Sequence, residues 1–178
     1  MPRIELLDPQ NTTGDKKEIF NQIQSAFGAT PNMFKTIANS TAALKMMWSA
    51  FGALGGGKLG AQLGEQIAVA VADVNRCEYC LAAHTALGKG AGLTSETMSH
   101  AQIGKSIDPK IQAALTFAIK LVKEKANIAP DDIAALKKAG YTDEDIAEIL
   151  AHVALNIFTN YTNVAFDVPV DFPKVSLS

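Results

Sequence analysis

The sequence predicts an all-α fold for a single domain of 178 residues. Apolar residues recur every three or four positions through most of the chain, and no segment alternates convincingly as a strand. Glycine, proline and N-capping residues separate these periodic stretches. Hydrophobic residues make up 48% and charged residues 19% of the chain, which is ordinary for a globular protein with a core of its own. We expect about residues 1–55 to form an N-terminal helical extension of the core that follows.

Three helices are expected in the N-terminal part, where apolar side chains share one helical face. They cover residues 16–27, 31–37 and 41–54. Pro31 opens the second helix, and Ser40 or Thr41 can cap the third. Residues 52–64 are rich in glycine, so we expect a loop there.

Two helices are expected on either side of a break at Asn75 and Arg76. They cover residues 66–74 and 77–89. Gly90 and Gly92 end the second helix because glycine is a poor helix former. If the chain reverses at the break, the two helices run antiparallel.

Further helices are expected in the C-terminal half, each with a recognisable start. They cover residues 94–101, 109–125, 130–139 and a stretch from 143 onward. Pro109 follows the capping residue Asp108, and Thr142 forms a capping box with Asp145. The tail from Val168 holds two prolines and should be extended.

Charge and hydropathy exclude several classes of function. The formal net charge is −2 without a basic cluster, so we expect no nucleic-acid partner. The longest apolar stretch, residues 67–72, is far too short to span a membrane. The first nine residues hold no long apolar run, so we expect no secretory signal and a cytoplasmic protein. In that reducing compartment a Cys-x-x-Cys indicates redox or metal chemistry rather than a structural disulfide.

The chain has only two cysteines, Cys77 and Cys80, and His84 follows four residues later. Positions three and four apart share one face of a helix. Helical residues at i and i+3 have Cα atoms about 5 Å apart, inside the roughly 4.4–6.8 Å range of a disulfide. The spacing therefore predicts a dithiol that can close, beside an imidazole that can move a proton.

Two features of the expected helices lower a thiol pKa, and they favour different cysteines. Cys77 would lie in the first turn of its helix, where the helix dipole stabilises an anion. His84 lies one turn beyond Cys80 and can accept or relay its proton. Glu65 is ten residues before Asn75 and His84 is nine after it. An antiparallel pair of helices would therefore set that carboxylate beside the imidazole, where it can orient and charge the ring.

Other interpretations of these residues remain open. Cys77 and Cys80 can be two small buried hydrophobes without chemistry. With His84, and with Glu65 as a fourth ligand, they can also bind zinc, although a structural zinc site usually takes ligands from a second knuckle.

The other two histidines and the glycine-rich segment are not expected to take part in the chemistry. His152 and Asn156 are spaced i, i+4 and are interpreted as a satisfied polar pair in the core, and His100 as a surface residue. Residues 52–58 fit the first part of a phosphate-binding loop, but Leu59 stands where Ser or Thr should hold magnesium. We interpret this segment as an ordinary loop.

The run from Glu65 to His84 resembles the signature of the AhpD-like alkylhydroperoxidases, which belong to the carboxymuconolactone decarboxylase superfamily. The signature is a Glu, then Cys-x-x-Cys twelve residues later, then His four residues beyond. Residues 160–163 and 170–173 also resemble the longer, peroxidase-related branch. The resemblance extends over most of the chain, and its specific motif covers residues 65–84.

This resemblance implies an AhpD-like multi-helix bundle that assembles as trimers or hexamers. It implies reduction of organic hydroperoxides without a metal, haem or other cofactor. By position, Cys80 would attack the peroxide and become a sulfenic acid, and Cys77 would then close the disulfide. Glu65 and His84 would form the proton relay. A dithiol reductant must reopen the bridge, and in some relatives it is a lipoyl-bearing protein.

We take Cys80 as the reactive thiolate because the spacing to His84 and the resemblance both favour it. Some relatives carry His between the cysteines, where this chain has Tyr79, and we interpret Tyr79 as a packing residue. The decarboxylases of the superfamily lack the paired cysteines, so their activity is not expected here. Two alternative functions are a general disulfide reductase or redox sensor, and a non-catalytic oligomeric helical module that holds zinc.

Overall fold

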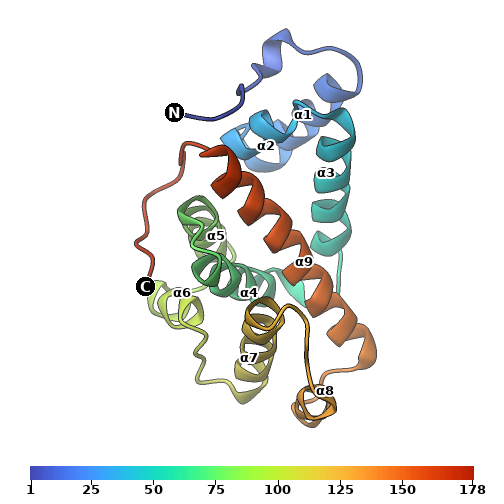
Figure 1. The fold of residues 1–178 in the computed structure, drawn as a ribbon, viewed down its shortest axis with the longest axis vertical. Helices are drawn as coiled ribbons and strands as arrows, with labels where there is room; N and C mark the ends of the chain where they lie inside the picture. The colour runs from blue at the N-terminus through green and yellow to red at the C-terminus, as the bar shows by residue number, and fades with distance from the viewer.

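Every regular element of the chain is helical, which confirms the predicted all-α class (Figure 1). The computed structural model describes residues 1–178. In chain order the elements are the 3₁₀ turn η1 (Pro9–Asn11) and the helices α1 (Gly14–Phe27), α2 (Asn32–Ile37), α3 (Thr41–Gly55), α4 (Gly60–Val74), α5 (Glu78–Gly90), α6 (Ser95–Gln102), α7 (Pro109–Lys123), α8 (Pro130–Lys138) and α9 (Asp143–Phe166). None of these helices combines the length and apolar character needed to cross a bilayer.

The predicted N-caps explain where several helices begin. The side chains of Ser40, Thr94 and Asp108 accept hydrogen bonds from main-chain N–H groups in the first turns of α3, α6 and α7. Thr142 and Asp145 form the predicted capping box at the start of α9. These contacts satisfy N–H groups that a helix leaves unpaired at its start.

Helix α4 is the centre of the fold. Every residue from Gln66 to Asp73 is buried, because α5, α6, α7 and α9 all pack against this helix. A helix that is buried on all sides is apolar all round, and this part of α4 consists mainly of Ile, Val and Ala. In Figure 1, α9 crosses the molecule diagonally, with α4 and α5 on one side of it and α3 on the other.

The loop expected over residues 52–64 is largely helical, so that prediction was wrong. Helix α3 continues to Gly55 and α4 begins at Gly60. The carboxylate of Glu148 in α9 accepts hydrogen bonds from the main-chain N–H groups of Lys58 and Leu59, each at 3.0 Å, and so fixes the short turn before α4. Tertiary contacts of this kind override the low helix propensity of glycine.

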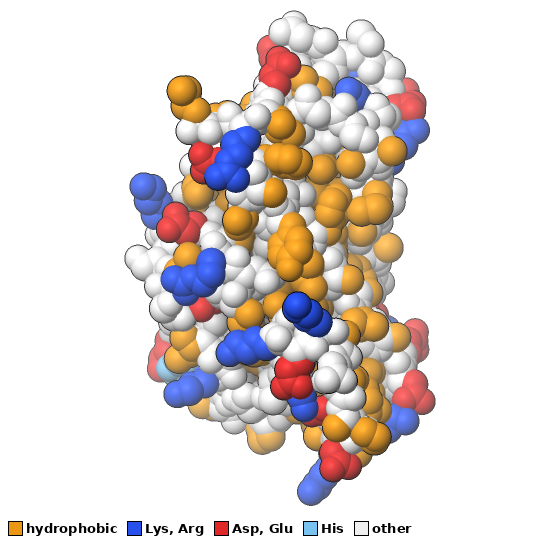
Figure 2. Space-filling view, in the orientation of Figure 1, with side chains coloured by type: hydrophobic (Ala, Val, Ile, Leu, Met, Phe, Trp, Pro, Cys, Tyr) orange, Lys and Arg blue, Asp and Glu red, His pale blue; other side chains and the backbone are white.

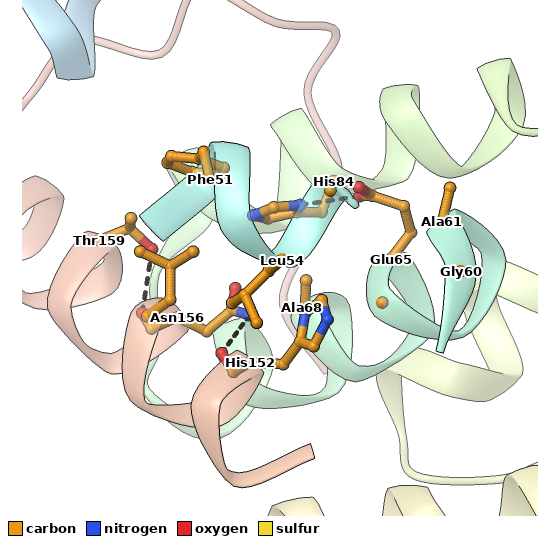
Figure 3. A pocket seen from close by; sticks show the side chains of 13 residues that line it. Phe51, Leu54, Gly60, Ala61, Glu65, Ala68, His84, His152, Asn156 and Thr159 are labelled. Carbon is orange, nitrogen blue, oxygen red and sulfur yellow. Dashed lines mark hydrogen bonds and ion pairs between the residues drawn. The ribbon is translucent and has the colours of Figure 1, made fainter. Parts of the chain in front are cut away.

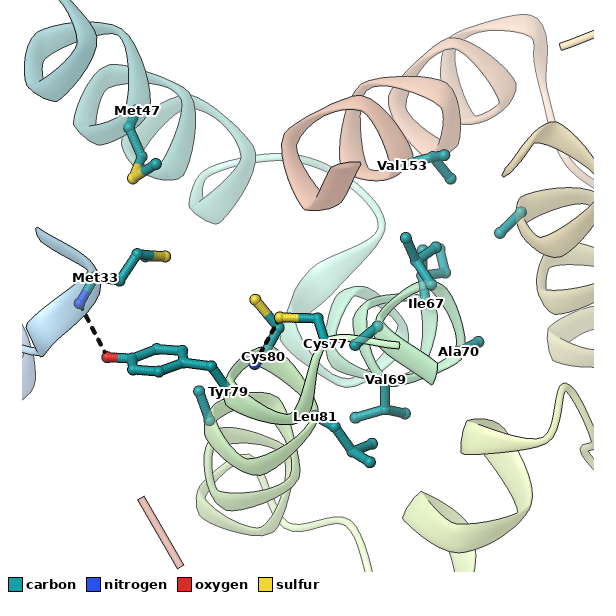
Figure 4. Packing of buried hydrophobic residues seen from close by; sticks show 14 of the residues in the cluster. Met33, Met47, Ile67, Val69, Ala70, Cys77, Tyr79, Cys80, Leu81 and Val153 are labelled. Atoms are coloured by element: carbon teal, nitrogen blue, oxygen red, sulfur yellow. Dashed lines mark hydrogen bonds between the residues drawn. The ribbon is translucent and has the colours of Figure 1, made fainter. Parts of the chain in front are cut away.

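The N-terminal helices and the C-terminal tail cover the end of α5 that carries the cysteines. Aromatic rings of α1, α2 and α3 pack together with centroids 5.7–6.3 Å apart: Phe27, Phe34, Trp48 and Phe51. The tail from Val168 is extended, as predicted. One cluster of 32 buried hydrophobic residues, part of which is drawn in Figure 4, runs from α1 to the tail, so the N-terminal helices have no separate core.

Candidate active site

The chain reverses between α4 and α5, as the break at Asn75 and Arg76 predicts. Arg76 has a φ of 56°, in the left-handed region that ends many helices. The Cys77 N–H returns to the Ala72 carbonyl at 2.9 Å. This tight turn lays α5 back against α4, so that side chains equally far from the turn can meet.

Glu65 and His84 do meet across this hairpin. Glu65 Oε2 lies 2.8 Å from His84 Nδ1, and the two side chains are only 19% and 11% exposed (Figure 3). Because Nδ1 is engaged by the carboxylate, Nε2 is the ring nitrogen that is free to exchange a proton.

The two cysteines are buried free thiols at the start of α5 (Figure 4). Cys77 is the N-cap residue, with extended backbone, and its sulfur accepts the N–H of Cys80 at 3.4 Å. The expectation that Cys77 lies within the first helical turn was therefore wrong by one position. Its side chain still caps the helix, in place of the usual Ser or Asp.

Helix α9 contributes polar groups that sequence reasoning did not connect with the dithiol. Asn163 Nδ2 lies 3.1 Å from the Cys80 sulfur, and the Cys80 thiol donates to Thr159 Oγ1 at 3.8 Å. Both polar side chains are buried. The signal in the sequence is the series Asn156, Asn160 and Asn163, which repeats at helical spacing along a helix whose other buried residues are largely apolar.

These surroundings act in opposite directions on the two thiols. Burial alone would raise the pKa of Cys80, but the Cys77 thiol, the positive charge of His84 and the amides of Asn160 and Asn163 lower it to about 6. The pKa of Cys77 is raised, because its thiol donates to Cys80 and is itself buried. The geometry thus favours Cys80 over Cys77 as the thiolate.

The imidazole of His84 is held in its charged form by its neighbours. Burial lowers the pKa of His84, but the charge and hydrogen bond of Glu65, together with the Cys80 thiolate, raise it above its usual value. The three groups therefore favour the Cys80 thiolate and the His84 imidazolium together, with the Glu65 carboxylate at the far side of the ring.

The chain resembles known proteins in sequence and in fold. Residues 41–124 match the carboxymuconolactone decarboxylase family. A peroxidase-related protein from Silicibacter sp. is 25% identical, with a TM-score of 0.83 over 94% of this chain and 91% of that chain. An alkylhydroperoxidase AhpD core, a peroxidase-related protein from Ralstonia eutropha, is also 25% identical, with a TM-score of 0.87 over 96% and 92%. The family match and these two structures support assignment of the chain to the AhpD-like/carboxymuconolactone decarboxylase superfamily.

A more distant structure shares the AhpD-like fold. The debrominase Bmp8, in a complex with 2,3,4-tribromopyrrole, is 19% identical, with a TM-score of 0.81 over 96% of this chain and 94% of that chain. This likeness concerns the fold alone. Among curated proteins, none matches the sequence.

This AhpD-like chain has Tyr79 between its cysteines, and the side chain has a structural contact there. The Tyr79 hydroxyl accepts the main-chain N–H of Met33 at 3.2 Å, and the ring packs edge-on against Phe172 at 5.7 Å. Burial, and then the carboxylate of Asp171, raise the pKa of Tyr79, so the hydroxyl stays protonated. The tyrosine thereby ties α5 to α2 and to the tail.

Replacing Tyr79 by Phe should destabilise the protein without changing the chemistry of the dithiol. The buried Met33 N–H would lose its acceptor, which costs about 1–3 kcal/mol. Urea unfolding measures the loss in free energy, and Tyr161→Phe, at a tyrosine that is 61% exposed, is the matched control. An unfolding midpoint equal to that of the control would contradict a structural role for the hydroxyl.

His152 and Asn156 are not the satisfied pair that their spacing predicts. Asn156 Nδ2 donates to the main-chain carbonyl of His152 at 2.9 Å, while Asn156 Oδ1 and His152 Nε2 are buried without a hydrogen-bond partner. The nearest carboxylate oxygen to His152 Nε2 is Glu148 Oε1, at 3.9 Å. The ring packs toward Gly64, where an added Cβ would lie 3.1 Å from His152 Cε1. Burial lowers the pKa of His152. His100 is exposed, as expected.

Two cavities adjoin His84. A cavity of about 140 Å³ with a mixed lining lies between α3, α4 and α9, and its polar lining residues include Glu65, His84, His152, Asn156 and Thr159 (Figure 3). A second, apolar cavity of about 30 Å³ touches both Cys80 and His84. It is walled mainly by aromatic rings: Phe27, Phe34, Phe51, Tyr79 and Phe172.

The zinc alternative lacks a set of ligands. No three His, Cys, Asp or Glu side chains are arranged so that they could hold a metal ion. Glu65 is directed at His84 instead of at the thiols.

The reactivity of Cys80 should depend on pH in a way that separates it from Cys77. Because the pKa of Cys80 is lowered to about 6, its thiolate fraction and its alkylation rate should rise through that pH and level off above it. Cys77, whose pKa is raised, should react slowly throughout the neutral range. Iodoacetamide labelling at a series of pH values, with the labelled cysteine assigned by peptide mass, measures both. Equal labelling of both cysteines, with one midpoint at a pH of about 8.5, would contradict the assignment of the lowered pKa to Cys80.

Proposed function

We propose that this protein is a thiol-dependent peroxidase that reduces organic hydroperoxides through a dithiol–disulfide cycle of Cys77 and Cys80. The observation that carries the proposal is the environment of the Cys80 sulfur. The Cys77 thiol, His84 and the α9 amides all favour the Cys80 anion although the group is buried. Such an environment is typical of a reactive thiol and not of a structural one.

In the first half-reaction, the Cys80 thiolate attacks the terminal oxygen of the hydroperoxide. The O–O bond breaks, the alkoxide leaves as an alcohol after taking a proton from the His84 imidazolium, and Cys80 becomes a sulfenic acid. Glu65 orients the ring through Nδ1, so the proton comes from Nε2.

In the second step, Cys77 attacks the sulfur of that sulfenic acid. The S–O bond breaks, water leaves, and the disulfide forms. At this stage Cys80 no longer carries the negative charge that raises the pKa of Cys77. Neutral His84 can therefore accept the Cys77 proton and pass it to the departing hydroxide, which leaves as water. A dithiol reductant, such as a lipoyl-bearing protein, then supplies two electrons and two protons and reopens the bridge.

The apolar cavity beside Cys80 supports an organic substrate. Its wall of aromatic rings favours burial of a hydrocarbon group next to the thiolate, whereas hydrogen peroxide would gain nothing from it. At about 30 Å³ the cavity can hold only the part of the organic group next to the peroxide, and the rest of that group would lie outside it.

The assembly and the compartment are parts of the same proposal. Figure 2 shows hydrophobic side chains gathered over α3 and α9, and large apolar residues there are exposed: Met46, Leu150, Tyr161 and Val164. This surface supports association between copies of the chain, and the family resemblance implies that the homo-oligomer is a trimer or hexamer. A cycle that starts from two thiols needs a compartment that keeps them reduced, which supports the cytoplasm.

Peroxide turnover tests the function and separates it from the disulfide reductase or redox-sensor alternative. We expect the reduced protein to consume cumene hydroperoxide catalytically with a dithiol donor and to form one alcohol per peroxide. The rate of oxidation by a small disulfide should be much slower. Faster oxidation by the disulfide than by the hydroperoxide would favour the alternative.

A further inference from the structure

Two asparagines of α9 stand beside the dithiol and are among the most buried polar residues of the protein. Asn160 is 0% exposed and Asn163 is 3% exposed. They are three positions apart and so share one helical face. Neither of them has a part in the thiol–imidazole–carboxylate chain described above.

Each of these amides uses one of its polar atoms and leaves the other unpaired. Asn163 Nδ2 contacts the Cys80 sulfur at 3.1 Å, while Asn163 Oδ1 has no hydrogen-bond partner. Asn160 Oδ1 accepts a hydrogen bond from Asn75 Nδ2 at 2.9 Å. Asn160 Nδ2 has no hydrogen-bond partner of normal geometry. The Asn160 amide is nevertheless close enough to Cys80 to lower the pKa of that thiol. An unpaired polar atom in a protein interior lowers the stability of the fold. Two such atoms beside one reactive group therefore indicate a function.

Side-chain contacts fix which way the two amides are turned. Asn75 ends α4 directly before the reversal and holds the oxygen of the Asn160 amide, so the N–H₂ group of Asn160 must face elsewhere. Asn163 lies in the last turn of α9, and the contact of its Nδ2 with the Cys80 sulfur at 3.1 Å sets the orientation of its amide. The unpaired donor and the unpaired acceptor are therefore set in place before any ligand arrives.

The unpaired N–H donor of Asn160 and the unpaired oxygen acceptor of Asn163 match the hydrogen-bonding groups of an S–O–H, which forms when oxygen is added to the Cys80 sulfur. A sulfenic acid has oxygen lone pairs, which accept, and one O–H, which donates. The terminal O–H of a hydroperoxide has the same two functions. Neither group is present on a free thiolate, so the two atoms stay unpaired in the reduced protein.

We propose that Asn160 and Asn163 are catalytic residues that bind the peroxide oxygen transferred to Cys80. This inference rests on the proposed peroxidase function and extends it. Asn163 Nδ2 stabilises the attacking thiolate. During attack, Asn160 Nδ2 donates to the oxygen that joins the sulfur, and Asn163 Oδ1 accepts the O–H of that oxygen.

The proposed contacts leave the balance of the reaction unchanged. The sulfur supplies the electron pair of the new S–O bond, and the O–O pair departs with the alkoxide, which takes its proton from His84. The hydrogen of the terminal peroxide oxygen remains on that oxygen and becomes the O–H of the sulfenic acid. The two amides therefore act as fixed dipoles and exchange no proton.

The test measures the oxidation rate per thiolate in a Cys77→Ala parent, where sulfenic acid on Cys80 cannot proceed to the disulfide. Asn160→Leu and Asn163→Leu are compared with Thr162→Val, a control at a buried polar residue of the same helix that contacts Phe158 instead of the thiols. The pKa of Cys80 is first measured for each variant from the pH dependence of alkylation. The rate of sulfenic acid formation by cumene hydroperoxide is then followed by dimedone trapping and mass spectrometry, at a pH well above each pKa.

We expect Asn163→Leu to raise the pKa of Cys80 by about 1, because a charge-assisted hydrogen bond is lost. Both leucine variants should lower the rate per thiolate by about 10-fold, because each loses one hydrogen bond to the transferred oxygen. Thr162→Val should keep the rate of the parent. If leucine is not accommodated, Asn160→Asp tests the same point, because it keeps the acceptor for Asn75 and removes the N–H donor.

The outcomes separate the inference from the function on which it rests. Adduct formation at one rate per thiolate in the parent and in both asparagine variants would overturn the role of the two amides and leave the peroxidase proposal intact. Absence of any adduct in the parent would overturn the peroxidase proposal itself. An unchanged pKa of Cys80 in Asn163→Leu would overturn the thiolate contact, whichever oxidant is used.

Discussion

Replacing Cys80 by Ser should abolish hydroperoxide reduction, whereas replacing Cys77 by Ser should leave one rapid oxidation per molecule. The thiolate of Cys80 is the proposed nucleophile, and a serine hydroxyl at this site is not ionised in the neutral range. Loss of a nucleophile lowers turnover by about 10⁴-fold or more. Cys77→Ser removes only the thiol that closes the disulfide, so Cys80 should still react once and stop as a sulfenic acid.

Peroxide consumption in the first turnover, measured by rapid mixing, distinguishes the two variants. Each is the control for the other, because both replace one buried sulfur by oxygen at the same turn. Full turnover by Cys80→Ser would contradict the assignment. An oxidation burst in Cys80→Ser and none in Cys77→Ser would show that the roles of the two cysteines are reversed.

Glu65→Gln should lower kcat/KM by about 10²–10³-fold, within the range that a proton-transfer partner contributes. Glutamine keeps the shape of the side chain and can still accept a hydrogen bond from His84 Nδ1, but it lacks the negative charge. The pKa of His84 should therefore fall, since the charge of Glu65 is what holds it above the usual value. With less positive charge beside it, the pKa of Cys80 should rise.

The pH profile gives the sign of this effect. Activity requires a Cys80 thiolate, which is lost as the pH falls, and a His84 imidazolium, which is lost as the pH rises. In Glu65→Gln the acid limb should therefore move to higher pH and the basic limb to lower pH, so the profile narrows from both sides. Glu78→Gln, which removes an exposed carboxylate next to Cys77, is the matched control and should keep the profile. An unchanged profile in Glu65→Gln would contradict the relay.

The sequence predicted the half of the site that is local. The spacing from Glu65 through the cysteines to His84 lies within one helical hairpin, so helix geometry and one chain reversal are enough to bring the carboxylate to the imidazole. Most helix starts were predictable for the same reason, since a cap depends on residues within one turn.

The remaining half depends on contacts between segments far apart in the chain. Asn163 is 83 residues from Cys80, and its place beside the sulfur follows from the packing of α9 against α4 and α5, which periodicity alone does not give. The early start of α4 depends on Glu148, about 90 residues away from the turn that it fixes. The i, i+4 spacing of His152 and Asn156 predicts a local pair. That prediction fails because the His152 ring packs against Gly64 of α4, a contact that spacing does not show.

The intact mass of the reduced protein after brief exposure to one equivalent of cumene hydroperoxide tests the central claim most directly. We expect a rapid loss of two hydrogens, which corresponds to a closed Cys77–Cys80 bridge, and no such loss when either cysteine is replaced. An unchanged mass in the reduced wild-type protein, with both thiols still free to alkylating agents after unfolding, would contradict a peroxide-reactive dithiol.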